Sequence, residues 1–198
     1  MKKLFFAFMS VIGLLCMGAC SSDVLNEGFD KIPDNLATRA SSSPNPYQKK
    51  DGDTFAKAGL SQSMSTQMPN TCVTSIMEYA NNKVFGGNTN EGTYILYYLQ
   101  TYGKNVITSG VDLKDIKPFV EHFFNTTSYS SYKKAVDNGH VVMTDITSSI
   151  PNSAHNVLVL GYQLNNDFVY MDPEKGSWYS VADSYFLKHY NIELTGIK

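Results

Sequence analysis

Several signatures of common protein classes are absent from this 198-residue sequence. The net charge is −2, so the chain lacks the basic footprint of a nucleic-acid-binding protein. Its three cysteines and four histidines are scattered and do not have the spacing of zinc ligands. Internal repeats and a Gly-rich phosphate-binding loop are also missing. What is present is 42% apolar and 17% charged residues, which is typical of one globular domain plus a leader.

The N-terminus has the order of a secretory signal. Two lysines precede an apolar run over residues 4–15, which is short for a membrane span of about 20 residues. Small or flexible residues then lead to Cys20. We expect residues 1–19 to be a signal peptide, whose removal would change the net charge to −4. An ordinary signal cut near Ala19 and a retained transmembrane helix are the alternatives.

A cysteine directly after small residues resembles the lipobox of bacterial lipoproteins. That resemblance implies that Cys20 is diacylated, becomes the mature N-terminus and anchors the protein to the outer membrane of the cell envelope. The residues Ser21, Ser22 and Asp23 resemble the surface-export signal of some Gram-negative lipoproteins, which implies exposure at the cell surface. Residues 20–53 are polar and poor in apolar side chains, so we predict a flexible tether there.

The three cysteines are predicted to have different fates. Cys16 leaves with the signal peptide and Cys20 carries lipid, which makes Cys72 the only thiol of the exported protein. A cysteine without a disulfide partner in an oxidising compartment calls for a chemical explanation. The alternative is that Cys72 is a buried, inert cysteine. The number of cysteines by itself does not decide between a reactive and an inert Cys72.

Residues 54–198 are predicted to form one α+β domain. Apolar periodicity predicts helices first and strands afterwards, and this order favours α+β over alternating βαβ units. A stripe of Tyr94, Tyr97, Tyr98 and Tyr102 in the second helix is interpreted as core packing. The predicted helices cover 72–81, 90–102, 112–124 (bent or split at Pro118), 131–138 and 183–189, and the predicted strands cover 141–146, 156–162, 168–171, 177–181 and 192–197.

Three residues have the chemistry of a nucleophile, a base and an orienting acid. Cys72 lies at the start of a predicted helix, where the helix end favours the thiolate. His155 opens a strand and Asp172 closes the next, 17 positions later, across a turn at residues 165–167. Simple pairing leaves the two a few residues out of register, so twist or a bulge must close the gap. If they meet, the carboxylate would fix the imidazole tautomer and support its cation.

Three blocks of sequence carry a resemblance to a known family. They are residues 67–75 (QMPNTCVTS), residues 135–142 (AVDNGHVV), and the stretch from His155 through Asp172 to Trp178. Together they resemble the papain-like cysteine peptidases, and are most similar to the bacteriocin-leader-processing peptidase family and its stand-alone relatives. The resemblance implies a papain-like fold, in which the nucleophile helix packs on an antiparallel sheet. It also implies a Cys72–His155–Asp172 triad, a peptide or protein substrate, and no cofactor or metal.

The same resemblance implies an oxyanion hole. Gln67 would supply its side chain, together with the backbone N–H of Cys72, and such donors typically lower the barrier by about 3 kcal/mol each. In the family the Gln usually lies one residue further from the Cys, and many members have Gly where Val73 stands. Asn70 is therefore a competing donor and Gln62 a weaker one.

The remaining histidines and the single tryptophan have weaker claims to a role. His122, His140 and His189 have no carboxylate at a comparable hairpin position, so His155 is the expected base. Trp178 would either shield the triad from water or pack in the core.

The resemblance leaves other functions open. An amidase or acyltransferase with the same triad, and an inert surface binding protein of the same fold, are the alternatives to a peptidase. The sequence does not indicate the oligomeric state.

Overall fold

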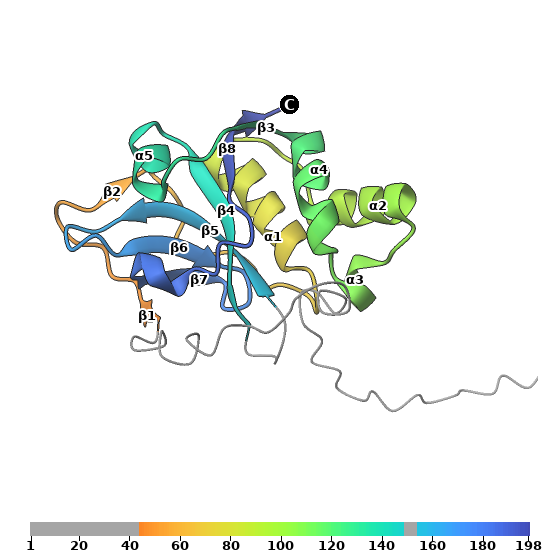
Figure 1. Cartoon of the computed structure of the whole chain (residues 1–198), viewed down its shortest axis with the longest axis horizontal. Helices are drawn as coiled ribbons and strands as arrows, with labels where there is room; N and C mark the ends of the chain where they lie inside the picture. Colours follow the sequence, from red (N-terminus) through yellow and green to blue (C-terminus); the bar gives the residue numbers. More distant parts are fainter. Residues whose placement is uncertain (1–43, 149–153) are drawn as a thin grey trace, which may run out of the picture.

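An antiparallel sheet flanked by helices forms the centre of the protein (Figure 1). The structure is a computed structural model and describes residues 44–148 and 154–198. The predicted signal peptide, the predicted lipidation site Cys20 and the predicted tether through residue 43 lie outside the described residues. Within the described ranges, no helix is long and apolar enough to cross a membrane.

The α-helices precede the long strands along the described chain, as the sequence predicts. They are α1 (Cys72–Tyr79), continued by the π-helical η2 (Ala80–Val84), then α2 (Glu91–Tyr102), α3 (Val106–Ser109), α4 (Leu113–Phe123) and α5 (Tyr132–Asp137). The ends of α2 follow local rules. The Asn90 side chain accepts a hydrogen bond from the backbone N–H of Thr93, and Gly103 ends the helix in the left-handed region with φ 71°.

Helix α4 runs through Pro118 without being split. A proline inside a helix removes the N–H that would reach the carbonyl four residues earlier. Here that carbonyl belongs to Lys114, which is exposed in the first turn of the helix, so water can take the place of the lost donor. The buried residues Ile116, Phe119 and Val120 hold the helix against the core.

The tyrosine stripe of α2 packs in the core. Tyr94 and Tyr98 are fully buried, and the ring of Tyr97 stacks on Phe119 of α4. Tyr94 also meets Phe123 edge to face, with ring centroids 4.8 Å apart. The prediction of core packing is therefore confirmed.

The sheet has eight strands in the order β1-β7-β6-β5-β4-β8-β3, and β2 pairs with β5 off this path. All of the pairs are antiparallel. The strands are β1 (Asn45–Pro46), β2 (Thr54–Phe55), β3 (Phe124–Thr127), β4 (Val141–Thr147), β5 (Ala154–Tyr162), β6 (Phe168–Asp172), β7 (Ser177–Val181) and β8 (Ile192–Ile197). A 3₁₀ turn at Asp183–Tyr185 stands where a brief helix is predicted. The α+β class is confirmed, and the arrangement is consistent with a papain-like fold.

Two clusters of buried side chains lie on the two faces of the sheet. The first includes most of α1, with Leu158 and Leu160 of β5. The second includes Tyr132 of α5, with Val157 and Val159 of β5. Alternate residues of β5 thus belong to different clusters, as the two-residue period of a strand requires.

The folded part begins before residue 54. Asn45 and Pro46 pair with β7 at one edge of the sheet, and Tyr47 is buried against Trp178. Residues 45–53 therefore belong to the fold, although their composition predicts a tether. A short edge strand tolerates a proline because its N–H is not needed in the ladder.

Trp178 lies within the α1-side core. Its ring stacks on Phe55 at 5.1 Å between centroids, and its Nε1 donates a hydrogen bond to the Tyr79 hydroxyl at 3.2 Å. These contacts favour core packing over shielding of the triad.

Candidate active site

Cys72 is the first residue of α1 and is completely buried. The loop before it is fixed locally, because Asn70 adopts a positive φ of 62° and its Nδ2 donates to the Ile107 carbonyl at 2.8 Å. Thr71 is the N-cap residue, although its side chain does not cap the helix. The first turn is attached to α2 through Glu91, which accepts hydrogen bonds from the hydroxyls of Thr74 and Ser75.

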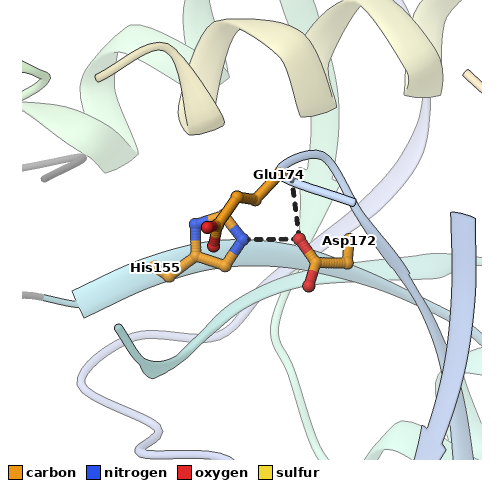
Figure 2. A group of neighbouring side chains, drawn as sticks. All are labelled: His155, Asp172 and Glu174. Carbon is orange, nitrogen blue, oxygen red and sulfur yellow. Dashed lines mark hydrogen bonds and ion pairs between the residues drawn. The ribbon is translucent and has the colours of Figure 1, made fainter. Parts of the chain in front are cut away.

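His155 and Asp172 meet at the open end of the β5–β6 hairpin (Figure 2). The His155 Nε2 lies 2.7 Å from the Asp172 Oδ1. Simple pairing of β5 with β6 would leave His155 and Asp172 offset along the strands. A bulge between Val159 and Gly161 shifts the pairing by one residue and reduces this offset. Asp172 then stands diagonally across from His155, within reach of a long side chain on the same face.

The surroundings of Asp172 favour its ionised form. Burial by itself would raise the pKa of the Asp172 carboxyl, but the hydrogen bond and charge of His155 lower it. The backbone N–H of Glu174 also donates to Oδ1 at 2.9 Å and lowers this pKa further. The net pKa is below the usual range for Asp, so the residue is a carboxylate at neutral pH and can hold the imidazole in one orientation.

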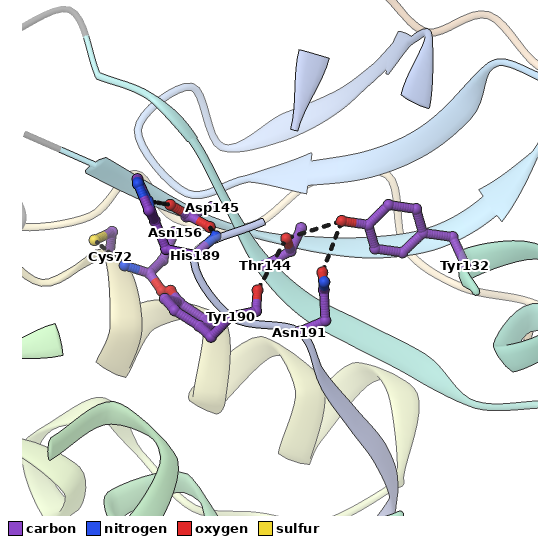
Figure 3. A network of polar contacts seen from close by, with 8 residues as sticks. All are labelled: Cys72, Tyr132, Thr144, Asp145, Asn156, His189, Tyr190 and Asn191. Atoms are coloured by element: carbon purple, nitrogen blue, oxygen red, sulfur yellow. Dashed lines mark hydrogen bonds and ion pairs between the residues drawn. The ribbon is translucent and has the colours of Figure 1, made fainter. Parts of the chain in front are cut away.

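Asn156 connects the start of β5 with the start of α1. Its Nδ2 lies 3.4 Å from the Cys72 Sγ, and Figure 3 shows the two side chains directed toward one another. His155 is the preceding residue of the same strand, so its side chain points to the face of the sheet opposite to that of Asn156.

The sulfur of Cys72 is disulfide-bonded in this structure, whereas the sequence predicts a cysteine without a disulfide partner. The Sγ position seen here therefore stands in for the thiol or thiolate that a reaction would need.

Among the predicted oxyanion donors, Gln67 is the one placed next to the third block. Its backbone N–H donates to the Pro173 carbonyl at 2.9 Å, directly after Asp172. Asn70 is a weaker candidate, because its amide nitrogen already serves the Ile107 carbonyl. Gln62 is exposed. The structure thus brings Gln67 to the Asp172 end of the hairpin, and its role as a donor stays a prediction.

The other histidines have partners that the sequence analysis missed. The His189 Nδ1 lies 2.5 Å from the Asp145 Oδ2, and the His140 Nδ1 lies 2.7 Å from the Glu193 Oε1. The partners are 44 and 53 positions apart, and no local pattern could have shown them. Neither pair is formed across a hairpin of consecutive strands, so neither histidine has a carboxylate at a hairpin position like that of Asp172. His122 instead stacks on the ring of Tyr97 at 4.2 Å.

One group of donors in the described ranges has the composition of a metal site. One ligand atom each from His155, Asp172 and Glu174 lies within 4.8 Å of the other two. Figure 2 shows the Glu174 carboxylate against the imidazole of His155. The two buried members already bond to each other and Glu174 is exposed, so a hydrogen-bonded dyad accounts for the geometry without an ion.

Comparison with known proteins identifies the family. No curated protein matches the chain at a significant level. The Peptidase_C39 like family matches residues 45–193, which include the whole sheet except the end of β8, and all of the helices. The match also begins where β1 begins, in agreement with the folded boundary described above. The chain therefore belongs to the Peptidase_C39 like family, within the papain-like cysteine peptidase superfamily.

Proposed function

We propose that this protein is an exported, lipid-anchored cysteine peptidase that hydrolyses peptide bonds with a Cys72–His155–Asp172 triad. The observation that carries the proposal is the 2.7 Å contact between His155 and Asp172 at the end of β5 where Asn156 touches Cys72. Membership in the Peptidase_C39 like family supports the reaction class and implies a peptide or protein substrate.

The proposed reaction starts from the reduced Cys72 at the N-terminus of α1. The helix end and a neighbouring imidazolium favour the thiolate, which is the attacking species. Asp172 holds the Nε2 side of the ring, so His155 would exchange its proton with the sulfur and the leaving amine through Nδ1. The thiolate attacks the peptide carbonyl, the amine leaves with the proton, and water hydrolyses the thioester.

The oxyanion formed during attack needs donors in fixed positions. The backbone N–H of Cys72 is proposed as one, because Cys72 opens α1 and the N–H groups of a first helical turn point out of the N-terminus. The Gln67 side chain is proposed as the second, since its backbone is tied to Pro173 beside the triad.

The proposed reaction needs Cys72 as a thiol or thiolate. The assay is therefore run on the mature chain in the presence of a reductant, with a peptide library as substrate and a thiol-alkylating probe as a second readout. Cys72→Ala and His155→Ala are the test variants. We expect cleavage only by the wild type, and faster alkylation of Cys72 than of free cysteine. Wild-type protein that neither cleaves nor reacts faster than free cysteine would contradict the proposal.

One observation favours a second candidate function, an inert surface binding protein of the same fold. Cys72 is completely buried in this structure, as inert structural cysteines commonly are. The two candidates differ in the response to reductant. A peptidase gains activity when Cys72 is reduced, whereas an inert binding protein gains neither cleavage nor rapid alkylation.

The lipid anchor is proposed from the order of residues around Cys20 alone. Incorporation of an alkyne-tagged fatty acid into the wild type but not into Cys20→Ala, together with outer-membrane fractionation, would support it. Equal labelling of both proteins, or none of either, would count against it.

A further inference from the structure

A second polar group lies beside Cys72 and is not part of the proposed triad. It consists of Asn156 on β5, its cross-strand partner Asp145 on β4, and His189 from the segment before β8 (Figure 3). We call it the Asn156 group. Its members are joined tightly, because Asp145 accepts from the backbone N–H of His189 at 3.0 Å as well as contacting its imidazole.

The Asn156 carboxamide is only half satisfied. Its nitrogen faces the Cys72 sulfur, whereas its Oδ1 is buried and has no hydrogen-bond partner among the described residues. The residue as a whole is 2% exposed. The hydroxyl of Tyr190, which Figure 3 shows next to this group, is likewise buried and unpaired within the described ranges. A buried acceptor without a donor costs about 1–3 kcal/mol, so a donor supplied by a bound substrate would relieve that cost.

Any substrate that reacts with Cys72 must come close to this acceptor. The carbonyl carbon of the scissile bond has to reach the Sγ, and the Sγ is in contact with the Asn156 carboxamide. The side chain of His189 is 32% exposed, so the group also has a side that faces solvent.

The charges of the group favour a neutral partner. The Asp145 hydrogen bond raises the pKa of His189, against the opposing effect of burial, which widens the pH range in which the imidazolium compensates the buried carboxylate. Within that range the pair leaves no net charge for a cation or an anion of the substrate.

We propose that the Asn156 group selects a substrate whose side chain next to the scissile bond carries an uncharged N–H or O–H donor, as a carboxamide or hydroxyl does. This proposal rests on the proposed function, since it concerns the substrate of the same site. An apolar side chain of equal size would leave the Asn156 oxygen buried and unpaired. A site built around a hydrogen bond discriminates strongly against an analogue that lacks the group.

The test compares matched peptides that differ only in this donor. Peptides with Gln or Met, and with Thr or Val, at each position flanking the cleaved bond are measured with the reduced wild type. We expect kcat/KM to favour Gln and Thr by about 10-fold or more at one position. Asn156→Leu is expected to bring that ratio close to one. Asn165→Leu, the same substitution in the turn of the same hairpin, is the matched control and should keep the wild-type ratio.

Binding to Cys72→Ala protein, measured by calorimetry with the same peptide pairs, separates recognition from turnover. If the wild type neither cleaves nor is alkylated, the proposed function fails. The ratio of the binding affinities of the paired peptides then still tests whether the Asn156 group recognises the donor. A wild-type ratio near one, or a preference for Met and Val, overturns the inference even when cleavage is rapid. If Asn156→Leu does not fold, Asn156→Ala replaces it, with the same expected loss of the ratio.

Discussion

Two histidine–carboxylate pairs have their carboxylates on β6 and β4, the strands on either side of β5, and they arise in different ways. His155 and Asp172 come from adjacent strands of one hairpin, and both are buried. His189 and Asp145 come from segments 44 positions apart, and the imidazole is partly exposed. A close imidazole–carboxylate contact is therefore not by itself the mark of a catalytic base.

The two pairs also differ in the group whose titration is shifted. In the hairpin pair, the carboxyl of Asp172 has its pKa lowered by His155 and by backbone N–H groups in spite of burial. In the long-range pair, the imidazole of His189 has its pKa raised by Asp145. The first pair therefore stabilises the fold mainly above acidic pH, and the second mainly below neutral pH.

The largest expected effect separates a catalytic pair from a structural one. His155→Ala is expected to lower kcat/KM of the reduced enzyme by about 10³-fold or more, because it removes the proposed base. His140→Ala also breaks an imidazole–carboxylate contact, but it should change kcat/KM by less than about 3-fold. A comparable loss in both variants would contradict the assignment of His155.

Asp172→Asn is expected to have the next largest effect. It keeps the shape of the side chain but removes the charge that supports the imidazolium and fixes the ring, so kcat/KM should fall by about 10²-fold or more. Alkylation of Cys72 should slow in parallel if the thiolate depends on a charged His155. If turnover is lost but the rate of Cys72 alkylation is unchanged, Asp172 only orients the imidazole ring and does not support the thiolate.

His189→Gln tests the second pair through stability. It leaves the Asp145 carboxylate buried with a weaker partner, so the free energy of unfolding at pH 6 should drop by about 1–3 kcal/mol. Because the folded pKa of His189 is raised, this stabilisation is complete below the unfolded value and is lost as the pH rises through the folded one. Urea unfolding at pH 6 and pH 9 should therefore show a smaller difference at pH 9; a larger one would contradict the pair.

Gly161→Ala tests the bulge that brings His155 to Asp172. A Cβ at this position would lie 2.5 Å from the Thr54 carbonyl oxygen, a backbone atom that cannot move freely. We expect a loss of about 1–2 kcal/mol in the free energy of unfolding, measured with denaturant. Gly196→Ala is the matched control, since its nearest neighbour would be 3.9 Å away. Equal effects of the two substitutions would show that close packing at Gly161 is not important.

The smallest effect is expected for Trp178→Phe. It removes the hydrogen bond to Tyr79 and part of the stacking on Phe55, which should cost about 1 kcal/mol of stability. The value of kcat/KM should stay within about 2-fold of the wild type. A large loss of activity in a stable variant would revive the alternative that Trp178 shields the triad.

Local rules accounted for most of the elements. Asn90 and Gly103 bound α2, Ser131 caps α5, and the turn at Asn166 has a positive φ of 65°. Strands β1, β2 and β3 were missed because they are two to four residues long and exist only through pairing with distant partners. The π-helical η2 after α1 also has no sequence signal.

The sequence by itself determined the candidate nucleophile, the α+β class and the hairpin that carries His155 and Asp172. These follow from short-range patterns: a cysteine at a helix start, helices before strands, and two strands joined by a turn. The family match is in agreement with this interpretation.

Only the tertiary structure decided which side chains meet. The bulge before Gly161 set the register of His155 and Asp172, and the packing of α1 on β5 brought Asn156 to Cys72. The pairing of β4 with β5 placed Asp145 opposite Asn156, and the return of the chain before β8 supplied His189. Contacts between residues 44 or 84 positions apart depend on how the elements pack, and no periodicity within one element contains that information.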